Sequence, residues 1–147
     1  MNWFRSIAPK QMLADVARCH IPRVIDLRGD YNTAIPGSIP VQFEPDVFYE
    51  SERWIQDMLG VTFRENQSIV LVCQMGHRAI EALDYFREKN PKSRFTVKVL
   101  EQGFFGYVRY VDIMTEPFKR RDVFRQELTD LATPPDRFSY LVSKLLE

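Results

Sequence analysis

Short runs of apolar residues alternate along this chain with segments whose apolar residues recur at helical spacing. The runs that predict buried strands lie at residues 23–27, 68–73 and 95–100. The segments that predict helices lie at residues 7–17, 48–59 and 78–89. The run at 68–73 is apolar without interruption after its first residue, which is typical of a strand buried on both faces of a parallel sheet. This order predicts an α/β domain with a central, mostly parallel sheet flanked by helices.

The remainder of the chain divides into loops and a helical tail. Residues 28–40 are rich in Gly, Pro, Asn and Asp and predict a loop, and Gly103 and Gly106 predict a turn after the last strand. From residue 116 onward no strand pattern remains, and apolar residues at helical spacing predict two helices. We therefore expect one domain over residues 1–115 and a C-terminal helical extension over 116–147 that packs on it, since so short a segment cannot bury a core alone.

Composition excludes several classes of partner. The chain has 147 residues, of which 45% are hydrophobic, and 20 basic residues balance 20 acidic ones. A net charge of zero gives no electrostatic reason to expect binding to nucleic acid or to an anionic membrane. No apolar run is long enough to span a bilayer, and the first ten residues lack the pattern of a signal peptide. We expect a cytoplasmic protein.

Two cysteines are present, and in a reducing compartment both are expected to be free thiols. Cys19 is expected to be a buried and inert core residue. The paired spacings of a zinc site are missing, so we predict no metal and no cofactor. The four side chains that such a site would need are Cys19, His20, Cys73 and His77.

Cys73 has a different setting, because it ends the predicted central strand and precedes a short glycine-containing loop and a helix. Such a loop turns its N–H groups toward a common centre, and the helix N-terminus adds partial positive charge. A thiol held there is favoured as the thiolate, which is the nucleophile, and Arg78 acts in the same direction. The alternative is an inert core cysteine, and His77 is either a substrate contact or a solvated loop residue.

Three separated segments of the sequence, together spanning about residues 5–112, resemble the rhodanese homology domain. Residues 24–28 and 35–38 are similar to the motifs "V-I-D-V-R" and "G-H-I-P-G-A" of that family. Residues 69–79 are similar to "I-V-V-Y-C-x-x-G-x-R-S", and residues 99–107 to "V-x-x-L-x-G-G-x-x-x-W". The sequence departs from these motifs at Thr33-Ala34, at Gln102 and at Tyr107, which stands in place of tryptophan.

The resemblance implies a sulfurtransferase that moves sulfane sulfur from thiosulfate or a persulfide to a thiol or cyanide, through a persulfide on Cys73. The acceptor is a small molecule or a protein thiol. Asp26 and Arg28 are expected to brace the loop. The residues expected to bind substrate are Gln74, Met75, Gly76, His77 and Arg78.

Two other functions remain open. Related phosphatases have five residues between cysteine and arginine, whereas Cys73 and Arg78 are separated by four. This shorter loop, and the lack of a histidine before Cys73, disfavour a small phosphatase or arsenate reductase. A non-catalytic interaction module is the other alternative, and the intact Cys, Gly and Arg disfavour it. A further possibility, within sulfur transfer, is that the apolar stripe at residues 138–146 docks a partner protein, which would make this protein a dedicated sulfur relay; an amphipathic helix usually buries that side on its own domain.

Overall fold

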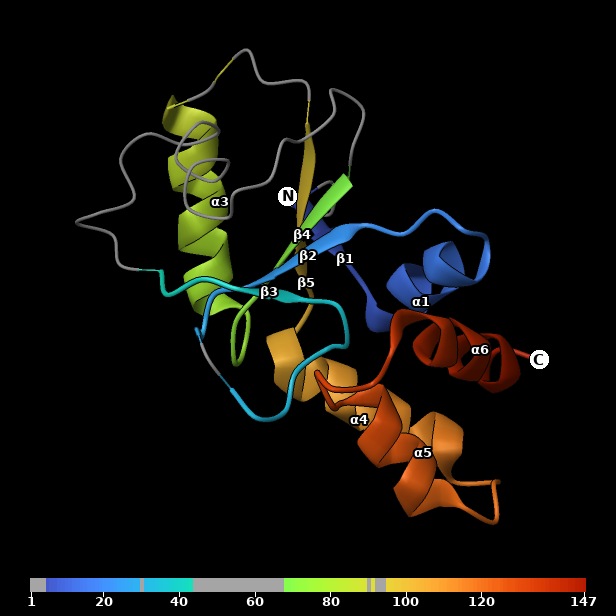
Figure 1. The fold of residues 1–147 in the computed structure, drawn as a ribbon. Coiled ribbons are helices and arrows are strands. Elements are labelled where there is room, and N and C mark those ends of the chain that lie inside the picture. The colour runs from blue at the N-terminus through green and yellow to red at the C-terminus, as the bar shows by residue number, and fades with distance from the viewer. Residues whose placement is uncertain (1–4, 30, 44–67, 90, 92–94) are drawn as a thin grey trace.

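The structure is a computed structural model, and it describes residues 5–29, 31–43, 68–89, 91 and 95–147. The helix expected at residues 48–59 lies outside this part of the chain. The described residues form a parallel sheet with helices on both faces, as Figure 1 shows. The predicted α/β class, with a central parallel sheet flanked by helices, is therefore confirmed.

The sheet has five strands in the order β1-β5-β4-β2-β3, and every neighbouring pair is parallel. Three of them, β2 (Arg23–Asp26), β4 (Ser68–Val72) and β5 (Thr96–Leu100), lie where the apolar runs predict strands. The outer strands β1 (Ser6–Ile7) and β3 (Ile39–Pro40) were not predicted. β3 lies inside the expected loop at 28–40, because two residues are too few to show a strand period.

The two faces of the sheet pack into two hydrophobic clusters, because successive side chains of a strand point to opposite faces. Along β4, Val70 and Val72 join the cluster that lies beneath α1 (Pro9–Ala17). Ile69, Leu71 and the following Cys73 join the cluster beneath α3 (His77–Lys89). The residues expected to face inward along α3, which are Ala79, Ala82, Leu83 and Phe86, are all buried. Cys73 is thus placed between the central strand and α3.

The turn predicted at Gly103 and Gly106 was wrong, because both glycines belong to helix α4 (Gly103–Thr115). A Cβ atom on Gly103 would lie 2.2 Å from the carbonyl oxygen of Cys73, and one on Gly106 would lie 2.7 Å from the carbonyl oxygen of Glu101. These positions lack side chains because backbones approach closely there, and such an approach has the same sequence signature as a turn.

Two further helices, α5 (Arg121–Leu128) and α6 (Pro135–Leu145), follow α4. The apolar side of α6 is buried in the same cluster as α1 and α4, through Phe138, Leu141, Val142 and Leu145. Figure 1 shows α1, α4, α5 and α6 gathered on the face opposite α3. The division of the chain at residue 115 remains a prediction.

The buried Tyr107 ties the tail to α4. Its hydroxyl donates a hydrogen bond to the carbonyl oxygen of Leu128 at the end of α5 (2.8 Å), and burial raises the pKa of this phenol well above its usual value.

No helix in the described part of the chain is long and apolar enough to cross a bilayer.

The expectation that Cys19 is a buried core residue was wrong, since its side chain is exposed. Cys19 follows the end of α1 with a left-handed φ of 64°. Its N–H donates to the carbonyl of Val16 (3.0 Å), and the N–H of His20 donates to that of Asp15 (2.9 Å). This is a Schellman motif, which ends the helix at a position normally occupied by glycine and turns the side chain outward.

Candidate active site

Cys73 lies directly after β4, at the carboxyl edge of the parallel sheet, where open α/β sheets place their sites. Its side chain is buried, with 4% of its surface exposed. The chain then turns through Gln74, Met75 and Gly76, and α3 begins at His77. Gly76 has a φ of +103°, which an L side chain rarely adopts, so the turn depends on glycine. The predicted arrangement of strand, loop and helix is present.

The Cys73 sulfur accepts two hydrogen bonds from backbone N–H groups. The N–H of Gly76 lies 3.1 Å from Sγ, and that of Ala79, in the first turn of α3, lies 3.3 Å from it. Both donors belong to the loop and helix that the sequence singled out, although Ala79 lies just beyond the predicted binding residues. Donors at a helix N-terminus favour negative charge on the group that they face. The geometry therefore suits a sulfur anion at Cys73.

The opposite side of the loop is held by α4. The N–H of Phe104 donates to the carbonyl of Cys73 (2.8 Å), and that of Phe105 donates to the carbonyl of Gln74 (3.1 Å). Two N–H groups that a helix N-terminus leaves unsatisfied thus find partners in the loop. Gly103 permits this approach, as a side chain there would collide with the loop backbone. This contact was not predicted, although Gly103 lies in the third segment that carries the resemblance.

Asp26 and Arg28 form a buried ion pair beside the loop. Nη2 of Arg28 lies 2.7 Å from Oδ2 of Asp26, and the two side chains are only 6% and 3% exposed. The guanidinium also stacks between the rings of Tyr31 and Phe104, at 4.3 and 4.2 Å from their centroids. Its Nη1 donates to Oε1 of Gln74 (3.3 Å). The pair therefore contacts the loop and also the helix that holds it.

A cavity of about 320 Å³ opens over Cys73. Four of the five predicted binding residues line it, namely Gln74, Met75, His77 and Arg78, while Gly76 contributes its N–H to the sulfur. The lining residues that the sequence analysis did not single out are Leu27, Tyr31 and Gln42. They come from the segments after β2 and β3. Leu27 lies in the segment 24–28 that resembles the family motif, whereas no local sequence signal marks Tyr31 and Gln42. The exposed Arg78 donates through Nη1 to the carbonyl of Phe43 (3.3 Å).

No group of three or more potential metal ligands occurs among the described residues. His20 lines a cavity at the amino end of β4, whereas His77 lines the cavity over Cys73 beyond the carboxyl end of that strand. The four side chains considered for a metal site are therefore divided between opposite edges of the sheet.

Comparison with known proteins agrees with this geometry. Residues 8–110 match the family described as Rhodanese-like domain. The chain belongs to the rhodanese-like domain family. A rhodanese-related protein from Thermoplasma volcanium is structurally similar, with a TM-score of 0.51 and 16% sequence identity over 72% of this chain and 92% of that one. At that identity the likeness shows the fold alone. A search of curated protein sequences gives no match.

The rhodanese-like match includes the Cys73 loop, Asp26, Arg28 and the first turns of α4, so it contains every residue placed at the site above. It ends at residue 110, within α4. The helices α5 and α6 lie beyond it. They reach the matched part of the domain through the bond from Tyr107 to Leu128 and through the core beside α1.

Proposed function

We propose that this rhodanese-like protein transfers sulfane sulfur through a persulfide on Cys73. The observation that carries the proposal is the pair of backbone N–H groups directed at Sγ, at 3.1 and 3.3 Å. Fixed donors in a site shielded from water stabilise charge that develops on a reacting atom. In the persulfide product the negative charge lies on the outer sulfur, and the backbone N–H groups of residues 74–78 are proposed to stabilise it there.

The first half of the reaction loads the sulfur. The Cys73 thiolate attacks the sulfane sulfur of thiosulfate, a new S–S bond forms, and the sulfur–sulfur bond of the donor breaks. Sulfite leaves with the bonding electron pair, and the enzyme persulfide keeps one negative charge. An organic persulfide reacts in the same way and releases a thiolate. This is two-step nucleophilic catalysis, in which the covalent intermediate divides one transfer into two.

The second half returns the enzyme to its starting state. An acceptor thiolate, or cyanide, attacks the outer sulfur of the persulfide, and the Cys73 thiolate leaves. The expected cytosolic location would supply reduced thiols as acceptors. The 320 Å³ cavity admits a small thiol or a cysteine side chain of a protein. His77 and Arg78, which line it from the first turn of α3, are proposed to attract the anionic donor.

The loop length favours sulfur over phosphate. α3 begins four residues after Cys73, and both donors to Sγ come from within six residues of it. Phosphoryl transfer needs donors around all equatorial oxygens of a larger group. Because two N–H groups of this short loop already contact the cysteine sulfur at 3.1 and 3.3 Å, the loop is proposed to take one added sulfur atom rather than a phosphoryl group.

The test is the mass of the intact protein after incubation with thiosulfate. Wild type is expected to gain one sulfur, about 32 Da, which cyanide or a reducing thiol removes. Cys73→Ser is expected to gain nothing, with unchanged thermal unfolding because the substitution is nearly isosteric. Cys19→Ser is the matched control, since it removes the exposed thiol and is expected to load like wild type.

Other outcomes contradict the proposal. Sulfur retained in Cys73→Ser but lost in Cys19→Ser would place the carrier on the exposed thiol. No sulfur gain in any of the proteins, with thiosulfate or with an organic persulfide, would favour the non-catalytic interaction module.

A further inference from the structure

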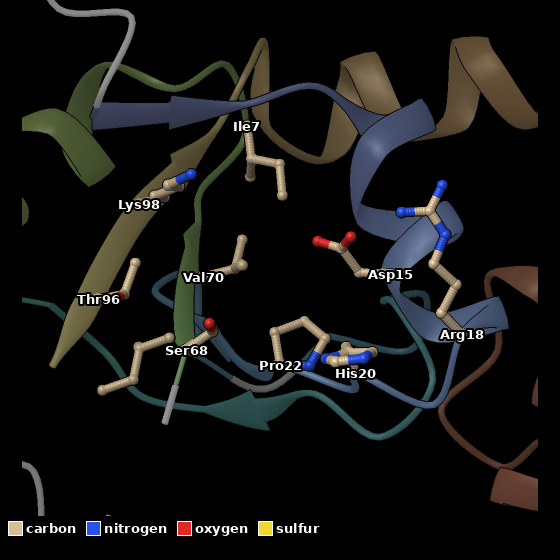
Figure 2. A pocket seen from close by; sticks show the side chains of 10 residues that line it. Ile7, Asp15, Arg18, His20, Pro22, Ser68, Val70, Thr96 and Lys98 are labelled. Atoms are coloured by element: carbon tan, nitrogen blue, oxygen red, sulfur yellow. The ribbon is translucent and has the colours of Figure 1, made fainter. Parts of the chain in front are cut away.

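A second cavity, of about 250 Å³, lies at the opposite edge of the sheet from Cys73. It is formed by the beginnings of β4 and β5, by β1, and by the C-terminal half of α1 with the segment that follows it, as Figure 2 shows. The polar and charged side chains of its lining are Asp15, Arg18, His20, Ser68, Thr96 and Lys98. The reaction proposed above uses none of these residues.

Two of the three charged side chains that line this cavity, Asp15 and Lys98, face each other across it, whereas the third, Arg18, is exposed. Figure 2 shows the carboxylate of Asp15 entering it from α1 and the ammonium of Lys98 entering it from β5. Both side chains are partly buried, and neither forms an ion pair with another described residue. Asp15 Oδ1 accepts a hydrogen bond from Nε2 of Gln11 (2.9 Å), which fixes the carboxylate on its side. Two partly desolvated charges held apart are complementary to a ligand that carries both charges itself.

The floor of the cavity adds hydroxyl groups beside the ammonium. Ser68 pairs with Thr96 and Val70 pairs with Lys98 in the parallel ladder between β4 and β5. These four side chains therefore share one face of the sheet, and paired side chains on one face lie within contact of each other. Ser68 and Thr96 offer hydroxyl donors next to Lys98, while Val70 gives an apolar surface between Lys98 and Asp15.

We propose that this cavity binds a small α-amino acid as its zwitterion. The carboxylate lies at Lys98 with the hydroxyl of Thr96, the ammonium lies at Asp15, and the side chain rests on Val70. The cavity of about 250 Å³ has room for a ligand of this size. A simple anion would meet the carboxylate of Asp15, and a simple amine would meet the ammonium of Lys98, so each is expected to bind more weakly.

This site is independent of the sulfur chemistry. β4 runs from Ser68 at the second cavity to Val72 just before Cys73. At about 3.3 Å for each residue, the two sites are roughly 16 Å apart. Loss of the Cys73 thiol is therefore not expected to change binding of the amino acid, and failure of one proposal leaves the other standing.

The test is amide chemical-shift mapping by ¹⁵N NMR on the full chain, with each of the twenty protein amino acids as probe. At about 10 mM, a ligand with a Kd of about 1 mM occupies most of the sites. At least one small amino acid is expected to shift the amides of Ser68, Val70, Thr96 and Lys98 in wild type and in Cys73→Ser alike. Its decarboxylated amine and its deaminated acid, which for serine are ethanolamine and 3-hydroxypropionate, are expected to bind at least about tenfold more weakly.

Variants then locate the two charges. Lys98→Met and Asp15→Asn are each expected to weaken binding about tenfold or more, because each removes a charge-assisted hydrogen bond. The exposed residues Lys10 and Glu88 provide matched controls, and Lys10→Met and Glu88→Gln are expected to leave Kd unchanged. The proposal is overturned if no amino acid shifts these amides, if the amine or the acid binds as well as the zwitterion, or if the control variants weaken binding equally.

Discussion

Replacing Asp26 with asparagine removes the negative charge that faces the buried guanidinium of Arg28. Removing one partner of a buried ion pair typically costs about 3–5 kcal/mol, because the remaining charge stays desolvated. Arg28 keeps its hydrogen bonds to Oε1 of Gln74 (3.3 Å) and to the carbonyl of Thr33 (2.9 Å), and it keeps both ring contacts. The expected cost of Asp26→Asn therefore lies at the lower end, about 3 kcal/mol.

Urea unfolding measures this cost as a shift of the midpoint at constant slope. For a chain of 147 residues the melting temperature should fall by about 6–12 °C. The Arg28→Met variant supplies the second arm of a double-mutant cycle. If the pair interacts as described, the double variant will be more stable than the sum of the single effects predicts, by about 1 kcal/mol or more. Glu88→Gln on the exposed side of α3 is the control, and it should stay within about 0.5 kcal/mol of wild type.

The reasoning fails if Asp26→Asn costs less than about 1 kcal/mol, or if the two single effects simply add. Either result would mean that the guanidinium is well solvated through the open cavity and that the loop does not depend on this pair. The rate of sulfur loading in the same variants tests whether Arg28 also positions the Cys73 loop, in addition to stabilising the fold. If the pair braces the loop, loading should slow in Asp26→Asn even under conditions where the protein remains folded.

Two further predictions concern packing and pH. Gly103→Ala places a methyl 2.2 Å from the carbonyl oxygen of Cys73 at a φ of +58°, so sulfur transfer should fall at least about tenfold and stability by more than about 1–2 kcal/mol. Gly37→Ala is the matched control in both assays, because its φ is +81° but nothing lies within 4 Å of the added carbon; equal effects of the two variants would refute the close approach. The hydrogen bond from Arg137 lowers the pKa of Glu127, so their interaction stabilises the fold above about pH 4.5 and is lost as the pH falls through the lowered pKa. Arg137→Gln should therefore melt below wild type at pH 7, with a gap that narrows as the pH falls through the lowered pKa of Glu127, and a gap that stays the same from pH 7 into the acid range would contradict this.

The central strands and α3 could be predicted because their patterns are local. Residues 69–72 are apolar on both faces because α3 covers one face and α1 the other, and continuous hydrophobicity records that burial directly. The inward face of α3 repeats at helical spacing for the same reason. The loop after Cys73 was visible because its glycine and its position between strand and helix both belong to one short stretch of sequence.

The residues around the loop were only partly predictable. Asp26 and Arg28 could be placed beside it, because neighbouring parallel strands end at the same edge of a sheet. Tyr31 and Gln42 reach the cavity from segments whose path is set by tertiary packing, including the bridge between Arg28 and Gln42. No pattern within those segments carries that information.

The wrong prediction of a turn at the start of α4 has a physical reason, because glycine meets two different structural requirements. Glycine in a turn is selected for its backbone freedom, whereas Gly103 also leaves space for the carbonyl of Cys73, thirty residues earlier in the chain. The bonds from Phe104 and Phe105 to the loop exist only because that space is empty. The conformation that directs two N–H groups at the sulfur is therefore a property of the loop together with the helix after β5. A sequence that kept the cysteine loop but filled the position of Gly103 would keep the motif and lose the geometry that the proposed sulfur transfer needs.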